Sequence, residues 1–284
     1  MAKRSLNGKL VFITGAARGI GKATAKALVD EGAHVVLADL DGDLAAHTAA
    51  ELGHGTVGIQ LDVTDHAALT AALDRVEAEH GPLDILINNA GIMAAVPFVD
   101  ETPESRNRQI AVNFLAPWHA TQDGIRRMRP RGRGHILNVA SLGGVVAMPG
   151  AATYTATKHA VVGLTETVSW EIRGSGIDIG CVLPAMVNTE LADGMKRTRA
   201  AAPIEPEEVA RLIVKTLQKP QRTVYAPSRM KGIMRFSNLI PGWLGDRLML
   251  ASGSDHLISD ALASGKRDDY EKRVVQSAPG SEHA

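Results

Sequence analysis

Two side chains of one predicted helix have the spacing needed to move a proton together. Tyr154 lies four residues before Lys158 within residues 151–170, whose composition predicts a helix, and this spacing places both side chains on one helix face. An ammonium near a phenol stabilises the phenolate, so we expect the tyrosine pKa to lie below its ordinary value of about 10. A tyrosine tuned in this way can act as a general acid or base at neutral pH. Taken alone, the pair is also typical of a helix surface.

A glycine-rich segment near the N-terminus has the spacing of a phosphate-binding loop. Residues 10–14 form a short apolar run that predicts a buried parallel strand, and residues 22–30 have the composition of a helix. Glycines at such a junction let the backbone approach a pyrophosphate, which the free N–H groups of the helix N-terminus can bind. By itself the segment is also compatible with an ordinary strand–helix turn. The residues expected to contact a dinucleotide here are Gly15, Arg18, Gly19, Ile20 and Gly21.

The second predicted strand, residues 34–39, ends in the carboxylate of Asp39. In a dinucleotide-binding fold a carboxylate at this place binds the adenosine ribose hydroxyls and repels the 2′-phosphate of NADP. Arg18 favours the opposite preference, because a guanidinium can bind that phosphate. A like-charge contact costs more than one missing salt bridge contributes, so we expect NAD rather than NADP as the cofactor.

Five further apolar runs alternate with helical segments along the chain. These predicted strands cover residues 57–61, 83–87, 135–141, 177–183 and 223–225. Alternation of this kind predicts parallel strands joined by right-handed helical crossovers. We therefore expect an α/β fold, with a Rossmann-like doubly wound sheet of seven parallel strands and helices on both faces. Residues 6–226 are expected to form it as a single domain.

Two polar residues stand out within apolar surroundings. Ser141 ends the predicted strand 135–141, at the sheet edge where open α/β proteins bind ligands. Asn113 lies in a mostly apolar predicted helix, and Pro117, four residues later, has no N–H to donate to the Asn113 carbonyl. We expect the helix to open at Asn113 and leave room for a water molecule.

Over residues 6–226 the chain resembles the short-chain dehydrogenase/reductase family. The features that carry the resemblance are Thr14-Gly15-x3-Gly19-Ile20-Gly21, Asn88-Asn89-Ala90-Gly91, Asn113, and Ser141 before Tyr154-x3-Lys158. The resemblance implies a general acid/base tyrosine, a lysine that lowers its pKa and binds the nicotinamide ribose, a serine that holds the substrate oxygen, and an asparagine that keeps a relay water. The implied catalytic residues are Asn113, Ser141, Tyr154 and Lys158.

The resemblance also implies further contacts with cofactor and substrate. The implied cofactor contacts beyond the glycine loop and Asp39 are Asp62, Val63, Asn89, Ala90, Gly91, Tyr154, Lys158, Val187 and Thr189. The implied substrate contacts are Ser141, Leu142, Tyr154 and Met186. One departure is visible, because Pro184-Ala185 stands where the family has Pro-Gly. Alanine disfavours positive φ, which bears on how this loop meets the nicotinamide.

The expected reaction is hydride transfer between NAD(H) and the CH–OH or C=O group of a small hydrophobic secondary alcohol or ketone. Such a substrate would be steroid-like, aryl or fatty, because the expected pocket wall is apolar. The wall candidates are Met93, Val96, Leu142, Val145, Met186 and Met195, although methionines also serve as core filler. Two alternatives remain: an NADPH-dependent carbonyl reductase, favoured by Arg18, and a protein that binds NAD(H) without turnover.

The composition restricts the other classes of function. The formal net charge is zero, so no bulk attraction to nucleic acid is expected. Cys181, the only cysteine, lies in an apolar run and is expected to be a buried thiol rather than part of a disulfide. The histidines show no metal-ligand spacing, so no metal is expected. Without a signal-like core or a membrane-length apolar run, we expect a soluble cytoplasmic protein, and the resemblance implies a homodimer or homotetramer.

The C-terminal part lies beyond all of these motifs. Residues 227–264 are expected to form an amphipathic helical extension that covers the substrate pocket or contacts a neighbouring subunit. The alternative is contact with a membrane surface through residues 229–252, where basic and apolar residues alternate. Residues 190–204 are expected to be mobile, and residues 265–284 to form a polar, flexible tail.

Overall fold

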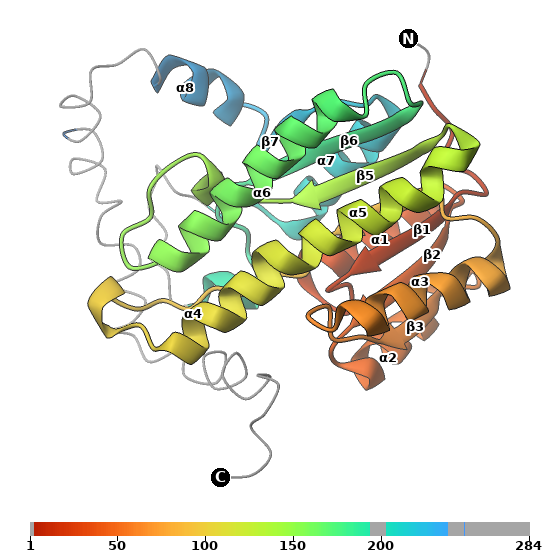
Figure 1. Cartoon of the computed structure of the whole chain (residues 1–284), viewed down its shortest axis with the longest axis horizontal. Helices are drawn as coiled ribbons and strands as arrows, with labels where there is room; N and C mark the ends of the chain where they lie inside the picture. The colour runs from red at the N-terminus through yellow and green to blue at the C-terminus, as the bar shows by residue number, and fades with distance from the viewer. Residues whose placement is uncertain (1–2, 194–202, 238–246, 248–284) are drawn as a thin grey trace.

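Seven parallel strands form one sheet through the centre of the protein (Figure 1). The computed structural model describes residues 3–193, 203–237 and 247, and within them the strand order is β3-β2-β1-β4-β5-β6-β7. The strands are β1 (Leu10–Thr14), β2 (His34–Asp39), β3 (Val57–Gln60), β4 (Ile85–Asn88), β5 (Gly134–Val139), β6 (Ile177–Pro184) and β7 (Thr223–Ala226). The predicted Rossmann-like doubly wound fold is confirmed, and every strand end lies within two residues of its predicted place.

The direction of winding reverses between β1 and β4. β1 pairs in parallel with β2 on one side and with β4 on the other, so the chain winds outward through β2 and β3 before it returns beside β1. Ligands of open α/β sheets bind beyond the carboxyl ends of the strands at such a reversal. The topology therefore predicts a ligand site at the segments that follow Thr14 and Asn88.

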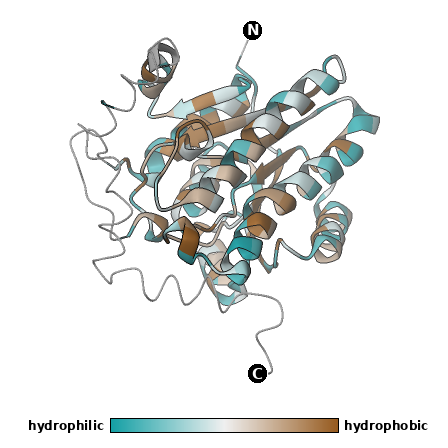
Figure 2. Cartoon of the chain, turned by 60° about the vertical axis from the view of Figure 1, so that its left-hand side comes forward, coloured by the Kyte–Doolittle hydropathy of each residue, from teal (hydrophilic) through white to brown (hydrophobic). Residues whose placement is uncertain are grey.

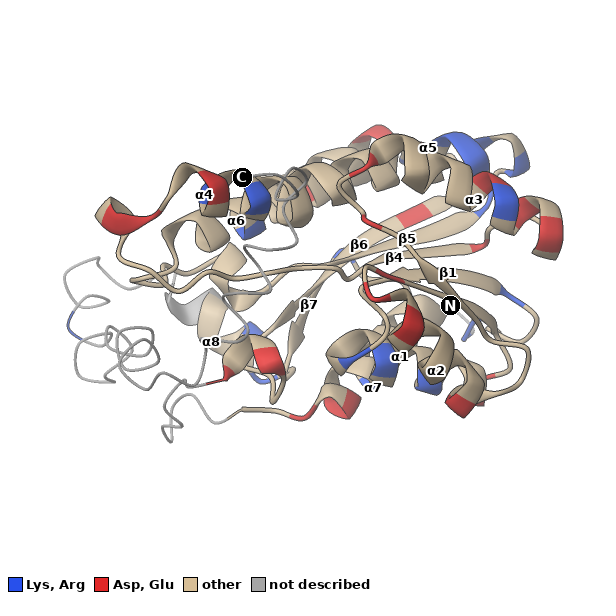
Figure 3. Ribbon diagram, turned by 90° about the horizontal axis from the view of Figure 1, so that it is seen from below, with Lys and Arg blue, Asp and Glu red and all other residues tan. Residues whose placement is uncertain are grey.

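Helices cover both faces of the sheet, as Figure 3 shows with the sheet seen between two helical layers. The helices of one layer are α1 (Gly19–Asp30), α2 (Gly42–Leu52) and α7 (Pro206–Gln218). The helices of the other layer are α3 (His66–His80), α4 (Pro103–Ile110), α5 (Ala116–Met128) and α6 (Ala152–Glu171). This arrangement is what alternating strands and right-handed crossovers produce.

The core lies on both faces of the sheet because successive side chains of a strand point to opposite sides. In β1, Val11 and Ile13 pack into the core beneath α1 and α7, whereas Leu10 and Phe12 pack beneath α3 and α5. Figure 2 shows the strands largely in the hydrophobic colour and the outer turns of the helices in the hydrophilic one. Cys181 in β6 is fully buried, which confirms the expected buried thiol.

The helix that carries Asn113 widens at this residue, as predicted. Between α4 and α5 the chain forms a π-helical turn over Ala111–Leu115, closed by a hydrogen bond from the Ala116 N–H to the Ala111 carbonyl. Pro117 in the first turn of α5 cannot donate to the Asn113 carbonyl. The widened turn thus lies where the missing N–H was expected to open the helix, and the Asn113 side chain in it is buried.

After β7 the described chain continues into α8 (Met230–Ser237), which lies within the predicted helical extension. The rest of that extension and the predicted polar tail lie outside the described residues, apart from residue 247. Of the segment expected to be mobile, Glu190–Ala192 forms a short 3-10 turn, and residues 194–202 are not described. No helix in the described part of the chain has the length and hydropathy needed to cross a bilayer.

Candidate active site

The glycine loop after β1 is shaped by close backbone contacts. Gly15 and Gly19 have φ values of +62° and +55°, which L side chains rarely adopt. A Cβ at Gly21 would lie 2.3 Å from the Gly15 carbonyl oxygen, so α1 can pack against the loop only with glycine there. At the start of α1, Arg18 makes no side-chain capping bond, and the first N–H groups of the helix are available to an anion.

The segment after β4 holds the glycine loop in place. The Thr14 hydroxyl accepts hydrogen bonds from the Asn89 and Ala90 N–H groups, both at 3.1 Å. The Asn89 side-chain amide donates to the Thr14 carbonyl at 3.0 Å and to the Gly15 carbonyl at 2.7 Å. Sequence reasoning assigned a role to Asn89 but none to Thr14, whose hydroxyl locks the two loops together.

Beyond these loops lies a cavity of about 630 Å³, here called the adenosine cavity because the residues predicted to meet the adenosine line it. Asp39 faces it, and its carboxylate accepts from the Ala17 N–H at 2.9 Å and from the Asp41 N–H at 3.2 Å. The Arg18 guanidinium lies 2.8 Å from a carboxylate oxygen of Asp41 and 3.3 Å from one of Glu190. Arg18 therefore forms ion pairs with two other acids and does not offset the negative charge of Asp39.

Asp62 and Val63 also line the adenosine cavity, as predicted. Asp62 accepts from the Thr64 N–H and hydroxyl at 2.9 and 2.7 Å. Arg108 from α4, which is almost fully buried, reaches the other Asp62 oxygen at 3.3 Å and the Thr64 hydroxyl at 3.0 Å. Sequence reasoning missed Arg108, because nothing in the local pattern of α4 indicates that its side chain crosses to Asp62.

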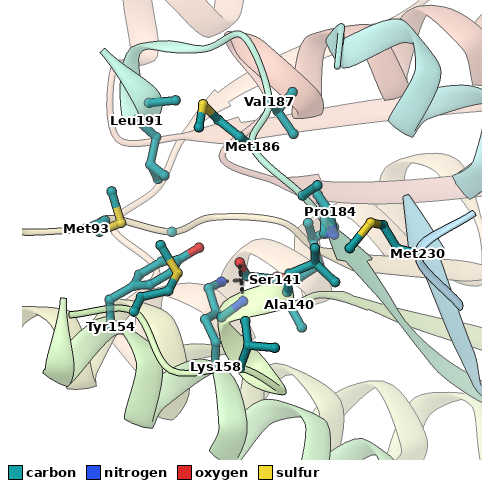
Figure 4. Close-up of a pocket in the computed structure, with 18 of the residues that line it drawn as sticks. Met93, Ala140, Ser141, Tyr154, Lys158, Pro184, Met186, Val187, Leu191 and Met230 are labelled. Atoms are coloured by element: carbon teal, nitrogen blue, oxygen red, sulfur yellow. Dashed lines mark hydrogen bonds between the residues drawn. The ribbon is translucent and has the colours of Figure 1, made fainter. Parts of the chain in front are cut away.

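A second cavity of about 720 Å³ lies beside the first, and it is called the catalytic cavity below because Ser141, Tyr154 and Lys158 line it. Tyr154 and Lys158 project from one face of α6, and both are buried. Figure 4 shows the tyrosine hydroxyl pointing into this space, with Ser141 beside it. Ser141 follows β5 and accepts a hydrogen bond from the Gly143 N–H at 3.0 Å, which fixes the hydroxyl at the cavity wall.

The predicted lowering of the tyrosine pKa is wrong for this structure. Burial raises the pKa of the Tyr154 phenol above its ordinary value, and the hydrogen bond with Ser141 only partly opposes this rise. The Lys158 ammonium lies 5.7 Å from the centre of the Tyr154 ring and donates to the Val139 carbonyl at 3.1 Å. Burial lowers the pKa of Lys158 to about 8. For both groups, loss of hydration disfavours the charged form and is the largest cause of the shift.

Asn113 joins the widened helical turn to the catalytic face of α6. Its side-chain oxygen accepts from the Ile92 N–H at 2.9 Å, and its amide donates to the Ile92 carbonyl at 2.8 Å and to the Thr157 hydroxyl at 3.3 Å. A Cβ at Gly91 would lie 3.3 Å from the Lys158 nitrogen and 3.4 Å from the Asn113 oxygen. Gly91 therefore keeps open the space between the two polar groups.

The wall of the catalytic cavity is largely apolar. Leu142, Met186 and Met93 line it as expected. The expectation for Val145 is wrong, because this residue is absent from the lining, and it packs against the buried cluster around Val161 and Leu183. Val96 is likewise absent from the lining, and Met195 lies outside the described residues. Lining residues that sequence reasoning missed are Val146, Met148, Leu191, Met230 and Ile233.

The loop after β6 accommodates its alanine without strain. Positive φ at residues other than glycine is confined, in the described part of the chain, to His54, so Ala185 does not occupy a conformation that requires glycine. Its N–H donates to the Ala226 carbonyl at 2.7 Å. Val187 and Thr189, which follow it, line the catalytic cavity. The departure at Pro184-Ala185 therefore leaves this loop in position.

Comparison with known proteins agrees with this geometry. The family model for short chain dehydrogenase matches residues 9–200, so the chain belongs to the short-chain dehydrogenase/reductase family. Momilactone A synthase from Oryza sativa subsp. japonica is 40% identical over 209 residues, which cover 72% of this chain and 74% of that protein. A 3-alpha-(or 20-beta)-hydroxysteroid dehydrogenase from Mycobacterium tuberculosis is 35% identical over 213 residues, which cover 74% of this chain and 82% of that protein.

A solved structure is similar over a larger share of the chain than these two relatives are. A short-chain dehydrogenase/reductase from Burkholderia phymatum, solved in complex with NAD, superimposes with a TM-score of 0.76 at 26% identity. The match covers 82% of this chain and 93% of that one. Together with the family match, this likeness makes the protein an oxidoreductase that uses a nicotinamide cofactor.

The residues present fit such a cofactor. The glycine loop leaves no room for a Cβ at Gly15, where it would lie 2.7 Å from the Ala90 backbone, and the uncapped start of α1 faces the same space. Both cavities share lining residues at their junction, among them Ile20, Asn89, Gly91 and Thr189. A dinucleotide can thus extend from Asp39 to Tyr154 without leaving the protein surface.

Proposed function

We propose that this enzyme transfers a hydride between NAD(H) and the CH–OH or C=O carbon of a small hydrophobic secondary alcohol or ketone. One observation carries the proposal: the Tyr154 and Ser141 hydroxyls face an apolar cavity that shares lining residues with the adenosine cavity. Residues 6–226 would form the catalytic domain, and α8 would begin an extension, residues 227–264, that contributes to the pocket wall.

Within this site the protein's own groups would handle the proton and the substrate oxygen. When bound, the nicotinamide accepts or donates the hydride. During alcohol oxidation, Tyr154 would take the hydroxyl proton as the carbon loses its hydride, and Ser141 would hold the oxygen. In ketone reduction the same proton would return to the oxygen. Lys158 and the space beside Asn113 would exchange that proton with solvent.

The direction of the tyrosine pKa shift bears on which reaction is the easier one. A raised pKa keeps Tyr154 protonated at neutral pH, and the protonated phenol is the form that donates a proton to a ketone oxygen. Oxidation requires the phenolate, whose population grows as pH rises. Ketone reduction is therefore the reaction for which the resting site is prepared at neutral pH.

Asp39 supports NAD over NADP. Its carboxylate is held by two backbone N–H groups, and no cation among the described residues forms an ion pair with it, so a 2′-phosphate at this place would meet a fixed negative charge. Arg18, which favoured the NADPH-dependent alternative, is paired with Asp41 and Glu190. We expect a preference for NAD of about tenfold or more, which corresponds to about 1.4 kcal/mol.

The outer face of α5 supports a homodimer or homotetramer built on the helices that carry Asn113 and Tyr154. Trp118 of α5 and Leu115, the last residue of the π-helical turn before it, are 37% and 42% exposed, and large apolar side chains grouped on a surface commonly mark a subunit contact. Light scattering on the wild type and on Trp118→Glu tests this part, and an unchanged mass for the variant would contradict it.

The experiment is a turnover assay of the wild type with a panel of hydrophobic secondary alcohols and ketones, using NAD(H) and NADP(H) in parallel. We expect turnover with NAD(H) and loss of most of it in Ser141→Ala, because that variant loses a hydroxyl at the substrate oxygen. Tight NAD(H) binding with no turnover of any panel member would favour a non-catalytic binding protein. Equal or better use of NADP(H) would favour the carbonyl reductase alternative.

A further inference from the structure

The two cavities carry different charges. The adenosine cavity is lined by acids and bases together, for example Asp39 and Asp62 with Arg18 and Arg108. Among the described residues that line the catalytic cavity, the charged ones are Lys158 and Arg229, and no aspartate or glutamate is present. An apolar space with cations and no anion among these residues is suited to a substrate that brings a negative charge of its own.

Lys158 is already engaged within the protein. Its ammonium is buried and donates to the Val139 carbonyl, and burial lowers its pKa to about 8. Its distance of 5.7 Å to the centre of the Tyr154 ring places it at the proton-transfer end of the cavity. A carboxylate bound to Lys158 would occupy the place of the reacting carbonyl, so Lys158 is not the receptor for a distal anion.

Arg229 is the second charged residue of the cavity wall. It immediately precedes α8, whose Met230 and Ile233 also line the cavity. In Figure 4, Met230 lies beside Pro184, on the far side of Ser141 from Tyr154. Arg229 is solvent-exposed, and no carboxylate of the described residues forms an ion pair with it. Its guanidinium is free to bind a ligand that extends along the apolar wall.

The chemistry of arginine selects the kind of anion. A guanidinium presents paired N–H donors that match the two oxygens of a carboxylate. Exposed ion pairs contribute little in water, but a pair at the mouth of an apolar cavity is partly removed from water and is correspondingly stronger. The six-residue stretch from Arg229 to Met234 also offers apolar surface at Met230 and Ile233 for the chain of such a ligand.

We propose that the substrates are amphipathic carboxylates: apolar ketones or secondary alcohols whose distal carboxylate pairs with Arg229 while the reacting oxygen lies against Ser141 and Tyr154. The proposal rests on the proposed function and names its substrate class. The ends of the cavity then have separate tasks. Arg229 sets the position of the substrate, and the reacting carbon is selected by its distance from the carboxylate.

The test compares medium-chain oxo acids, with the ketone at successive positions, against their methyl esters, which lack the charge. For the wild type with NADH, we expect kcat/KM to be about tenfold higher for the best acid than for its ester. In Arg229→Ala that ratio should fall to about one through a higher KM for the acid, with kcat nearly unchanged. Arg229→Lys should retain part of the preference, because it keeps the charge and loses the paired donors.

Lys231 provides the matched control. It is exposed in the first turn of α8, two residues after Arg229, and carries the same charge, but it does not line the cavity. Lys231→Ala should keep the wild-type ratio of acid to ester. An equal loss in both variants would mean a general surface potential and would overturn the proposal. Turnover of esters and acids with equal efficiency in the wild type would also overturn it, while leaving the proposed function intact.

A binding measurement separates the two proposals if turnover fails. Saturated medium-chain carboxylates contain no reacting carbonyl, so their binding to the NADH complex can be followed by nucleotide fluorescence without chemistry. We expect them to bind about tenfold more tightly than their methyl esters in the wild type and equally in Arg229→Ala. Tight carboxylate binding without turnover of any oxo acid would contradict the proposed function alone. Equal binding of carboxylate and ester to the wild type would contradict the inference alone.

Discussion

The adenosine cavity and the catalytic cavity are built in different ways. Much of the first is formed by backbone and charged groups of the motif segments, namely the glycine loop, the end of β2, the turn after β3 and the segment after β4, and Arg108 and residues 188–191 complete it. The wall of the second is formed by apolar side chains from segments far apart in the chain, such as Met93, Met148, Met186 and Met230. The motifs of the cofactor site are therefore encoded locally, whereas the wall of the substrate site depends on how distant loops come together.

The largest expected effect is a loss of turnover without a loss of cofactor binding, and it should follow from replacing the proton donor. Tyr154→Phe removes the hydroxyl from the catalytic cavity and leaves the adenosine cavity untouched, so turnover should fall by about 10²–10⁴-fold while NADH affinity stays nearly constant. Steady-state kinetics and fluorescence titration measure the two quantities. Unchanged turnover would remove Tyr154 from the mechanism.

A change in the glycine loop should instead weaken the binding of NADH. Gly21→Ala puts a Cβ 2.3 Å from the Gly15 carbonyl oxygen, so the loop must move away from its position. We expect a loss of about 2–3 kcal/mol of NADH binding from misplaced hydrogen bonds, which is roughly a hundredfold in Kd.

Gly163→Ala is the matched control for this change. Gly163 lies within α6, and a Cβ there meets nothing within 4 Å. Its replacement should leave Kd unchanged and raise the free energy of unfolding by roughly 0.5–1 kcal/mol, because alanine is the better helix former. Wild-type NADH affinity in Gly21→Ala would contradict the account of the loop.

The pH profile tests the electrostatics of the catalytic cavity. Because burial raises the Tyr154 pKa, the phenolate needed for oxidation is scarce at neutral pH, and kcat/KM for alcohol oxidation should rise about tenfold per pH unit through the neutral range. Ketone reduction needs the phenol and should be level over the same range. An oxidation rate that is already level at neutral pH would mean that the bound cofactor brings the pKa back down.

The smallest expected change concerns the adenosine cavity again. Asp39→Ala removes the negative charge near the ribose, so the ratio of kcat/KM for NAD to that for NADP should fall by about tenfold. Asp39→Asn keeps the size and one acceptor oxygen, and it should lower the ratio for the same electrostatic reason. Equal use of both cofactors by the wild type would contradict the assignment of Asp39.

The sequence allowed the fold and the local motifs to be predicted because each depends on neighbours along the chain. Apolar runs between glycines mark the strands, and Pro117 alone predicts the opening of the helix at Asn113, now seen as a π-helical turn. The spacing of Tyr154 and Lys158 placed both on one buried helix face. These features need no knowledge of tertiary contacts.

The direction of the Tyr154 pKa shift could not be predicted in the same way. Spacing shows that a cation is near, but burial, which has the larger effect here, depends on the packing of the loops around Met93 and Met148 against α6. The contact of Arg108 with Asp62 and the approach of α8 to the cavity also join segments distant in sequence. Periodicity carries no signal for such contacts.

The measurement that tests most directly whether the two cavities form one active site is the fate of the transferred hydrogen. Ketone reduction is run with NADH that carries deuterium at both C4 positions, so that either face delivers the label, and the alcohol product is analysed by mass spectrometry and NMR. The account predicts deuterium on the carbinol carbon of the product, because the cofactor and the substrate meet at the junction of the cavities. Product without deuterium at that carbon would contradict direct hydride transfer and, with it, the assignment of this site.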